Sequence, residues 1–213
     1  MSRVLLCGAT GLVGREVLRL ALDDAAVTRV VAPTRRPLAP HPKLENPVVD
    51  FERLPAGAAW WHADAAICTL GTTLRDAGSP TAFRRVDFDY VLAFARLARA
   101  GGAQAFALTS SLGADAASRY LYLRTKGEVE QAVQALGYPS LTVLRPSLIG
   151  GERERRRLRE QLGMRLLQVL APIVPRRWRI VPAPRIAQAL LQSALAMTPG
   201  CAVISSEQLQ SSA

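Results

Sequence analysis

The sequence predicts an α/β protein in which a parallel β-sheet is covered by helices on both faces. Short apolar runs typical of strands alternate with longer segments of helical periodicity along almost the whole chain. The first apolar run is followed directly by a glycine-rich turn that opens a helical segment. Because 49% of the 213 residues are apolar, a chain of this length can bury a sizeable core between such layers.

The strand-like runs are rich in apolar and β-branched residues and are bounded by glycine, proline or polar residues. They cover residues 3–7, 27–33, 45–54, 62–71, 103–111, 140–146 and 201–206. The helical segments have apolar residues three or four positions apart, and most of them end at glycine or proline. They cover residues 8–24, 83–102, 120–137, 152–172 and 184–196.

The order of these elements predicts repeated βαβ units, since consecutive parallel strands need a crossover connection that is usually a helix. One connection differs: residues 33–47, between the second and third strands, contain five prolines, which exclude regular structure there. Neither an internal repeat nor a low-complexity linker divides the chain. We therefore expect a single domain over residues 1–213.

Composition narrows the class of protein. No apolar run reaches the roughly 18 residues that a membrane span needs, and the N-terminus has the pattern of a first strand, so we expect a cytoplasmic protein. Cys7 and Cys68 end apolar runs, which predicts buried thiols, and Cys201 stands far from both. His41 and His62 have no second ligand at metal spacing, so no metal site is expected. The net charge of +10 is compatible with nucleic acid, an acidic membrane or an anionic ligand.

The glycine-rich turn points to a phosphate-containing ligand. Gly8, Gly11 and Gly14 follow the first strand and open the first helix. Glycines there allow a sharp turn, a close backbone approach to a pyrophosphate and tight packing of the helix on the strand. The helix N-terminus then offers free N–H groups to the phosphates. A tight turn with nothing bound is the alternative, but its place as the first βα turn favours dinucleotide binding.

The end of the second strand bears on which dinucleotide is bound. An acidic residue there commonly holds the ribose hydroxyls of NAD. This chain has Arg35 and Arg36 instead. Because a guanidinium can bind a 2′-phosphate through paired charge-assisted hydrogen bonds, we predict NADP(H) as the cofactor. The alternative is that both arginines are solvated loop charges.

A tyrosine and a lysine suggest the chemistry. Tyr122 and Lys126 are four residues apart, on one face of the predicted helix. The ammonium stabilises a phenolate and lowers the tyrosine pKa, so the phenol can give or take a proton at a carbonyl oxygen. Ser110 and Ser111, at the end of the preceding strand, could hold that oxygen. Tyr120 has no lysine at this spacing and is predicted to be a packing or surface aromatic.

Taken in order, these motifs resemble the atypical short-chain dehydrogenase/reductase superfamily. More narrowly, "CTLGTTLRDAG", "VDFDYVLAFARLARAGG", "YLYLRTKGEVE" and "VLRPSLIGGERE" are similar to the Tat-interacting-protein branch of oxidoreductase-like proteins. The similarity runs from about residue 4 to residue 207. It implies a Rossmann-type, doubly wound parallel sheet that binds NADPH.

The resemblance also implies site residues. Tyr122 and Lys126 would be the catalytic pair, with Ser111 or Ser110 completing the triad. The residues that would contact the cofactor lie in the glycine turn, after the second, third, fourth and sixth strands, and on the catalytic helix. They are Gly8, Thr10, Gly11, Leu12, Val13, Gly14, Arg35, Arg36, Asp50, Phe51, Leu70, Gly71, Thr72, Tyr122, Lys126, Pro146, Ile149 and Arg157.

The chain after the sixth strand is short for this superfamily. We expect residues of about 147–185 to form a small substrate-side lobe, with a pocket that is small or partly open. Members of the branch are known to bind NADPH and act through protein partners, so the resemblance supports cofactor binding better than it supports turnover.

The basic segment 153–165 has six arginines in and around a leucine stripe, Leu158, Leu162 and Leu166. A core-packed helix with a solvated outer face is the first interpretation. A lid that attracts an anionic ligand, and a patch for a phosphate backbone or an acidic lipid, are the other two. No aromatic residue is interleaved with these arginines, so stacking on bases is unsupported.

Three functional hypotheses follow. The first is an NADP(H)-dependent oxidoreductase that acts on a small carbonyl or alcohol substrate. The second is an NADPH-binding sensor or regulator that acts through a protein partner, and the third, ranked last, is a nucleic-acid-binding protein. The helices around residues 84–99 and 122–136 could pair in a homodimer.

Overall fold

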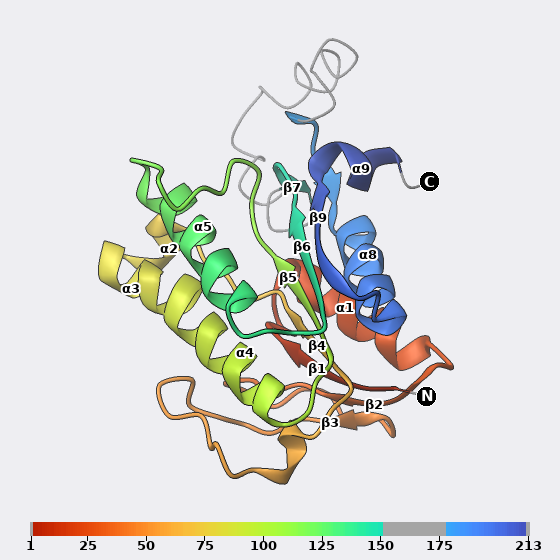
Figure 1. Ribbon diagram of the computed structural model, residues 1–213. Coiled ribbons are helices and arrows are strands. Elements are labelled where there is room, and N and C mark those ends of the chain that lie inside the picture. Colours follow the sequence, from red (N-terminus) through yellow and green to blue (C-terminus); the bar gives the residue numbers. More distant parts are fainter. Residues whose placement is uncertain (1, 151–177, 212–213) are drawn as a thin grey trace.

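The structure is a computed structural model that describes residues 2–150 and 178–211 (Figure 1). The main sheet contains β1 (Ser2–Cys7), β2 (Val27–Val31), β3 (Leu44–Glu45), β4 (Ala65–Cys68), β5 (Ala105–Thr109), β6 (Ser140–Arg145) and β9 (Gly200–Ser205). A two-stranded ribbon joins β7 (Ile149–Gly150) to β8 (Val181–Pro182). The helices are α1 (Leu12–Asp23), α2 (Leu74–Ala77), α3 (Pro80–Arg84), α4 (Tyr90–Ala100), α5 (Leu121–Gln134), α8 (Ala183–Ala196) and α9 (Ser206–Ser211), with a 3-10 turn η1 (Ala59–Trp61) and a π-helical turn η2 (Arg85–Asp89).

The main sheet is parallel throughout, in the order β3-β2-β1-β4-β5-β6-β9. From β1 the chain builds outward to β3 on one side, and then returns to β4 and builds outward to β9 on the other. The predicted α/β class with a doubly wound parallel sheet is confirmed. The reversal leaves a crevice at the carboxyl ends of β1 and β4, where open parallel sheets commonly bind their ligands.

Helices cover both faces of the sheet (Figure 1). Helices α1 and α8 pack on one face together with alternate strand residues such as Val4 and Leu6. Helices α4 and α5 pack on the other face, which takes the intervening residues Leu5 and Cys7. This alternation is the period of two expected along a strand, and burial on both faces explains why the strands are apolar almost throughout.

Two predicted segments need correction, and others fall outside the described residues. The third strand, expected over 45–54, is reduced to Leu44–Glu45 and a single bridge between Thr34 and Val48, because Pro47 has no N–H to extend the ladder. The helix expected over 83–102 is divided by η2 between α3 and α4. The helix expected over 152–172, the arginine-rich segment and most of the lobe expected over 147–185 lie outside the described residues.

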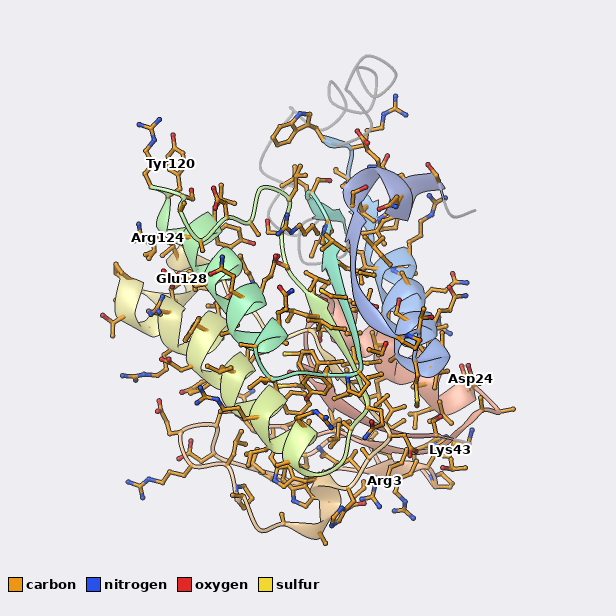
Figure 2. All side chains as sticks on the ribbon, viewed as in Figure 1. Arg3, Asp24, Lys43, Tyr120, Arg124 and Glu128 are labelled. Atoms are coloured by element: carbon orange, nitrogen blue, oxygen red, sulfur yellow. The ribbon has the colours of Figure 1, made fainter. Side chains whose placement is uncertain are left out.

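Within the described ranges no helix is long and apolar enough to cross a membrane. Cys7 and Cys68 are buried free thiols, as predicted, whereas Cys201 is exposed. Tyr120 is also exposed and points away from the body of the protein at the start of α5 (Figure 2). Of the two roles predicted for Tyr120, packing aromatic or surface aromatic, the structure shows the second.

Helix α1 approaches β1 so closely that only glycine fits at the contact. A Cβ added to Gly14 would lie 2.0 Å from the carbonyl oxygen of Gly8 and 2.7 Å from Oγ1 of Thr69. Gly8 itself has φ of +88°, a left-handed conformation that side chains rarely adopt. The glycine spacing seen in the sequence therefore meets a steric requirement of the fold.

We predict that Gly14→Ala lowers the free energy of unfolding by about 3 kcal/mol or more, because the new methyl group collides with backbone that cannot move aside cheaply. Gly57→Ala is the matched control, since nothing lies within 4 Å of a Cβ at Gly57, and its effect should stay within about 0.5 kcal/mol. Urea denaturation followed by circular dichroism measures both. Equal stability of the two variants would contradict the packing argument.

Candidate functional site

A cavity of about 260 Å³ lies at the carboxyl edge of the sheet, in the crevice between β1 and β4. The glycine turn, the loop after β4, the turn η2, the end of β5, helix α5 and strand β7 all contribute to it. Its lining residues are Gly11, Leu12, Val13, Thr69, Leu70, Gly71, Thr72, Thr73, Asp76, Asp87, Thr109, Ser110, Tyr122, Lys126 and Ile149. A cavity of about 310 Å³ between α5, β6 and β9 is larger, but neither the glycine turn nor the Tyr122–Lys126 pair lines it. We therefore place the candidate site in the first.

One wall of the cavity is the N-terminus of α1. Gly11 is the N-cap, no side chain caps the helix, and its first turn contains no acidic residue. The first N–H groups of a helix have no partner within the helix, and they carry the positive end of its dipole. This wall therefore suits an anionic group such as a phosphate.

Helix α5 also lines the cavity, and it holds Tyr122 and Lys126 one turn apart. The Tyr122 ring is half-buried and packs on Phe83, with 5.7 Å between ring centroids. Lys126 is buried. The structure thus brings the predicted pair to one cavity together with the glycine turn, although 110 positions separate the two motifs along the chain (12 to 122).

Lys126 forms a buried ion pair with Asp87, with 2.7 Å between Nζ and Oδ1. The side chains are 7% and 0% exposed, so water screens the pair very little. The second carboxylate oxygen, Oδ2, accepts a hydrogen bond of 2.8 Å from the N–H of Thr72. Asp87 thereby connects the loop after β4 to helix α5.

The charge of Lys126 is maintained against its burial. Burial lowers the pKa of Lys126, but attraction to Asp87 and to the phenolate of Tyr122, and the hydrogen bond with Asp87, raise it. Electrostatic attraction to Cys68 raises this pKa further. The net result is a pKa of Lys126 above its ordinary value of 10.5, so the side chain is charged at neutral pH.

Sequence reasoning did not identify Asp87, although a signal for it was present. Phe83, Asp87 and Val91 are spaced by four residues, so Asp87 lies in the apolar stripe of the predicted helix. A carboxylate in such a stripe is almost never buried without a partner. The partner, Lys126, could not be named because it lies on another helix, and the π-helical turn η2 that contains Asp87 breaks the expected periodicity.

The two predicted serines differ in their surroundings. The hydroxyl of Ser110, which lines the cavity, donates a hydrogen bond to Glu130 of α5. Glu130 in turn accepts from Arg145 of β6, with 3.1 Å between Oε1 and Nε. Ser111 does not line the cavity, and its hydroxyl lies 3.4 Å from the carbonyl oxygen of Leu112.

The other predicted cofactor residues that the structure describes do not line the cavity. Arg35 and Arg36 are exposed just beyond β2, where the hydroxyl of Thr34 donates to the carbonyl of Arg36 at 2.6 Å. Asp50 is exposed, whereas Phe51 is buried and its ring lies 5.7 Å from that of Tyr90. Gly8, Thr10, Gly14 and Pro146 are likewise absent from the lining, and Arg157 falls outside the described residues. In the parts of the chain that are described, no cluster of His, Cys, Asp or Glu could hold a metal ion.

Comparison with known proteins gives the family. No family model matches the chain. The rat protein HTATIP2 is 38% identical over 198 residues, which are 89% of this chain and 80% of that protein. The chain belongs to the HTATIP2 and FMP52 family. A second member of this family, the protein fmp52, mitochondrial, of Emericella nidulans, is 36% identical over 177 residues, 76% of this chain and 73% of that protein.

Solved structures share the fold of this family member at low sequence identity. MoeE5 in complex with UDP-glucuronic acid and NAD has a TM-score of 0.72 and 19% identity, over 94% of this chain and 75% of that one. A short-chain dehydrogenase/reductase family oxidoreductase from Burkholderia thailandensis has a TM-score of 0.71 and 19% identity, over 98% and 92% of the two chains. The HTATIP2 and FMP52 family member therefore has the Rossmann-type fold of short-chain dehydrogenases.

The predicted cytoplasmic location is contradicted by the family. The fungal FMP52 relatives are named mitochondrial, including the protein of Candida albicans, which is 32% identical over 164 residues. The strand-like pattern of the N-terminal residues bears on secretion and does not distinguish the cytoplasm from a mitochondrion.

We predict that Asp87→Asn lowers the free energy of unfolding at pH 7 by about 3–5 kcal/mol, because it leaves a buried ammonium without its counter-charge. The folded pKa of Lys126 is raised above 10.5, so the ion pair stabilises fully below about pH 10.5 and loses this effect as pH rises through the raised value. The difference in unfolding free energy between wild type and variant should therefore shrink at alkaline pH. Urea titrations between pH 7 and pH 11 measure it.

The matched control is Asp50→Asn, which removes an exposed carboxylate. It should change the unfolding free energy by about 0.5 kcal/mol or less at every pH in this range. An Asp87→Asn protein as stable as the control would mean that the ion pair contributes nothing to the fold.

Proposed function

We propose that the protein is an NADP(H)-dependent oxidoreductase of the short-chain dehydrogenase type, acting on a small carbonyl or alcohol. One observation carries the proposal: the uncapped N-terminus of α1 and the Tyr122–Lys126 pair line a single cavity. The first suits a pyrophosphate and the second suits proton transfer, which are the two requirements of a nicotinamide-dependent reduction. NAD in the solved complexes of MoeE5, which has the same fold, supports the choice of a dinucleotide.

The residues present fit such a cofactor. A Cβ at Gly11 or Gly14 would meet the Gly8 carbonyl, so the turn is held in a tight conformation, and Gly11, Leu12 and Val13 line the cavity. Gly11, Leu12 and Val13 would hold the pyrophosphate, and Leu70, Gly71 and Thr72 would face the ribose. Asp50 and Phe51 would lie toward the adenine, and Pro146 and Ile149 toward the nicotinamide.

When bound, NADPH would supply the hydride, and the side chains of this chain would handle the proton and the substrate oxygen. Tyr122 would hold a proton at its phenol oxygen and give it to the carbonyl oxygen of the substrate. Lys126, kept charged by Asp87, would stabilise the resulting phenolate and bind the ribose hydroxyls. Ser111 or Ser110 would orient the substrate oxygen; Ser110 lines the cavity but its hydroxyl donates to Glu130, whereas Ser111 lies outside the lining and its hydroxyl contacts the carbonyl of Leu112.

We predict that Tyr122→Phe lowers the rate of NADPH oxidation with a carbonyl substrate about 100-fold or more, because the phenol proton is lost. The dissociation constant for NADPH should change by less than about threefold, since the ring and its packing on Phe83 are kept. Stopped-flow absorbance at 340 nm and calorimetry measure the two quantities. Undiminished turnover would remove Tyr122 from the proposed mechanism.

Arg35 and Arg36 would select NADP(H) over NAD(H). Both are exposed beyond β2 and free to meet a 2′-phosphate with charge-assisted hydrogen bonds. We predict that the double variant Arg35→Gln, Arg36→Gln binds NADPH roughly 10- to 100-fold more weakly and NADH with little change.

The control for this double variant is Arg96→Gln, Arg119→Gln, which removes the same charge from exposed positions on α4 and before α5. It should bind both cofactors as the wild type does. If the Arg35, Arg36 variant lost affinity for NADPH and NADH equally, the two arginines would not bind the 2′-phosphate.

A second candidate is an NADPH-binding regulator that acts through a protein partner. It is favoured by the engagement of two reactive groups, Lys126 with Asp87 and Ser110 with Glu130, in bonds within the protein. An assay of NADPH consumption with a panel of aldehydes, ketones and quinones distinguishes the two candidates. An enzyme consumes NADPH in the presence of some member of the panel. A regulator leaves NADPH intact across the panel and binds its partner with an affinity that depends on the cofactor.

A further inference from the structure

Thr109 is the last residue of β5, and its side chain has no role in the mechanism proposed above. Along β5 the neighbouring residues alternate between the two cores, with Ala107 packed on the α1 side and Leu108 on the α4 side. The period of two places Thr109 on the side of α1. It lines the candidate cavity together with Gly11 and Tyr122, and is 9% exposed.

The hydroxyl of Thr109 finds no hydrogen-bond partner in the described part of the chain, although its oxygen has less than 1 Å² of accessible surface. Buried hydroxyls without a partner are uncommon, since burial removes their bonds to water and leaves nothing in return. Two other hydroxyls of the same cavity are engaged: Thr69 donates to the carbonyl of Cys7 at 3.0 Å, and Ser110 donates to Glu130. The missing bond at Thr109 thus sets it apart from its neighbours.

We propose that the Thr109 hydroxyl is a binding residue for the nicotinamide half of the dinucleotide. This inference rests on the proposed function. The nicotinamide half is the one that must lie near Tyr122 and Lys126, and both line the cavity with Thr109. A hydroxyl can donate and accept, so it suits the carboxamide or the hydroxyls of the adjoining ribose.

Binding through the buried oxygen requires a change of rotamer. Rotation by about 120° about Cα–Cβ in one direction brings Oγ1 to the position that the methyl group held, while the methyl group moves to the position of the Cβ hydrogen. For most buried hydroxyls this rotation would break a hydrogen bond, but Thr109 has none to lose among the described residues. The ligand therefore gains a bond without a compensating loss within the protein.

The test is calorimetry with Thr109→Val, which keeps the shape of the side chain and removes the hydroxyl. The probes are NADP⁺ and 2′-phospho-ADP, which lacks both the nicotinamide ring and its ribose. We expect the variant to bind NADP⁺ about tenfold more weakly and 2′-phospho-ADP within twofold of the wild type. Thr109→Ser, which retains a hydroxyl, should bind both probes as the wild type does.

A second readout needs no ligand. Because Thr109→Val removes a buried polar group that has no partner, the melting temperature of the cofactor-free protein should rise by about 1–4 °C. Thr125→Val is the matched control, since the Thr125 hydroxyl of α5 is also buried without a partner in the described ranges and Thr125 does not line the cavity. It should raise the melting temperature similarly and leave NADP⁺ binding unchanged.

Three results would overturn the inference. Thr109→Val could bind NADP⁺ as tightly as the wild type, or lose affinity for both probes equally, which would place the contact outside the nicotinamide half. A fall in the melting temperature of the cofactor-free variant would show that the hydroxyl has a structural partner. If the wild type itself bound neither probe, the proposed function would fail first and this inference would fall with it.

Discussion

The buried ion pair between Lys126 and Asp87 is the interaction on which the candidate site depends. It joins three parts of the chain: the loop after β4, through the N–H of Thr72; the turn η2, which contains Asp87; and helix α5. A buried charge is tolerated only when its partner and its hydrogen bonds are in place, so the three parts are held in one arrangement. All three parts contribute residues to the lining of the cavity.

The π-helical turn η2 makes this arrangement possible. Such turns insert one residue into a helix and redirect the side chains around it, and they are frequent at functional sites. Here the turn lies between α3 and α4 and contains the buried carboxylate. Gly71 completes the contact, because a Cβ at Gly71 would lie 3.2 Å from Oδ1 of Asp87 and 3.4 Å from Nζ of Lys126.

Helix α5 organises the polar side chains of the site along one face. Tyr122, Lys126 and Glu130 follow one another at intervals of four residues, so they stack along the helix. Tyr122 lines the cavity, Lys126 binds Asp87, and Glu130 binds Ser110 and Arg145. The helix can approach the loop after β5 because of Gly127, where a Cβ would lie 2.1 Å from the backbone nitrogen of Ala116.

The sequence alone determined the fold class, the glycine turn and the spacing of Tyr122 and Lys126, because each depends on local periodicity or on residues a few positions apart. Only the tertiary structure decided that Lys126 pairs with Asp87, that Ser110 is bound by Glu130, and that Thr109 lines the cavity without a partner in the described chain. These contacts join residues from 20 to 39 positions apart, as with Ser110–Glu130 and Asp87–Lys126. No local pattern encodes them, since they arise only when parallel strands bring their carboxyl ends to one edge.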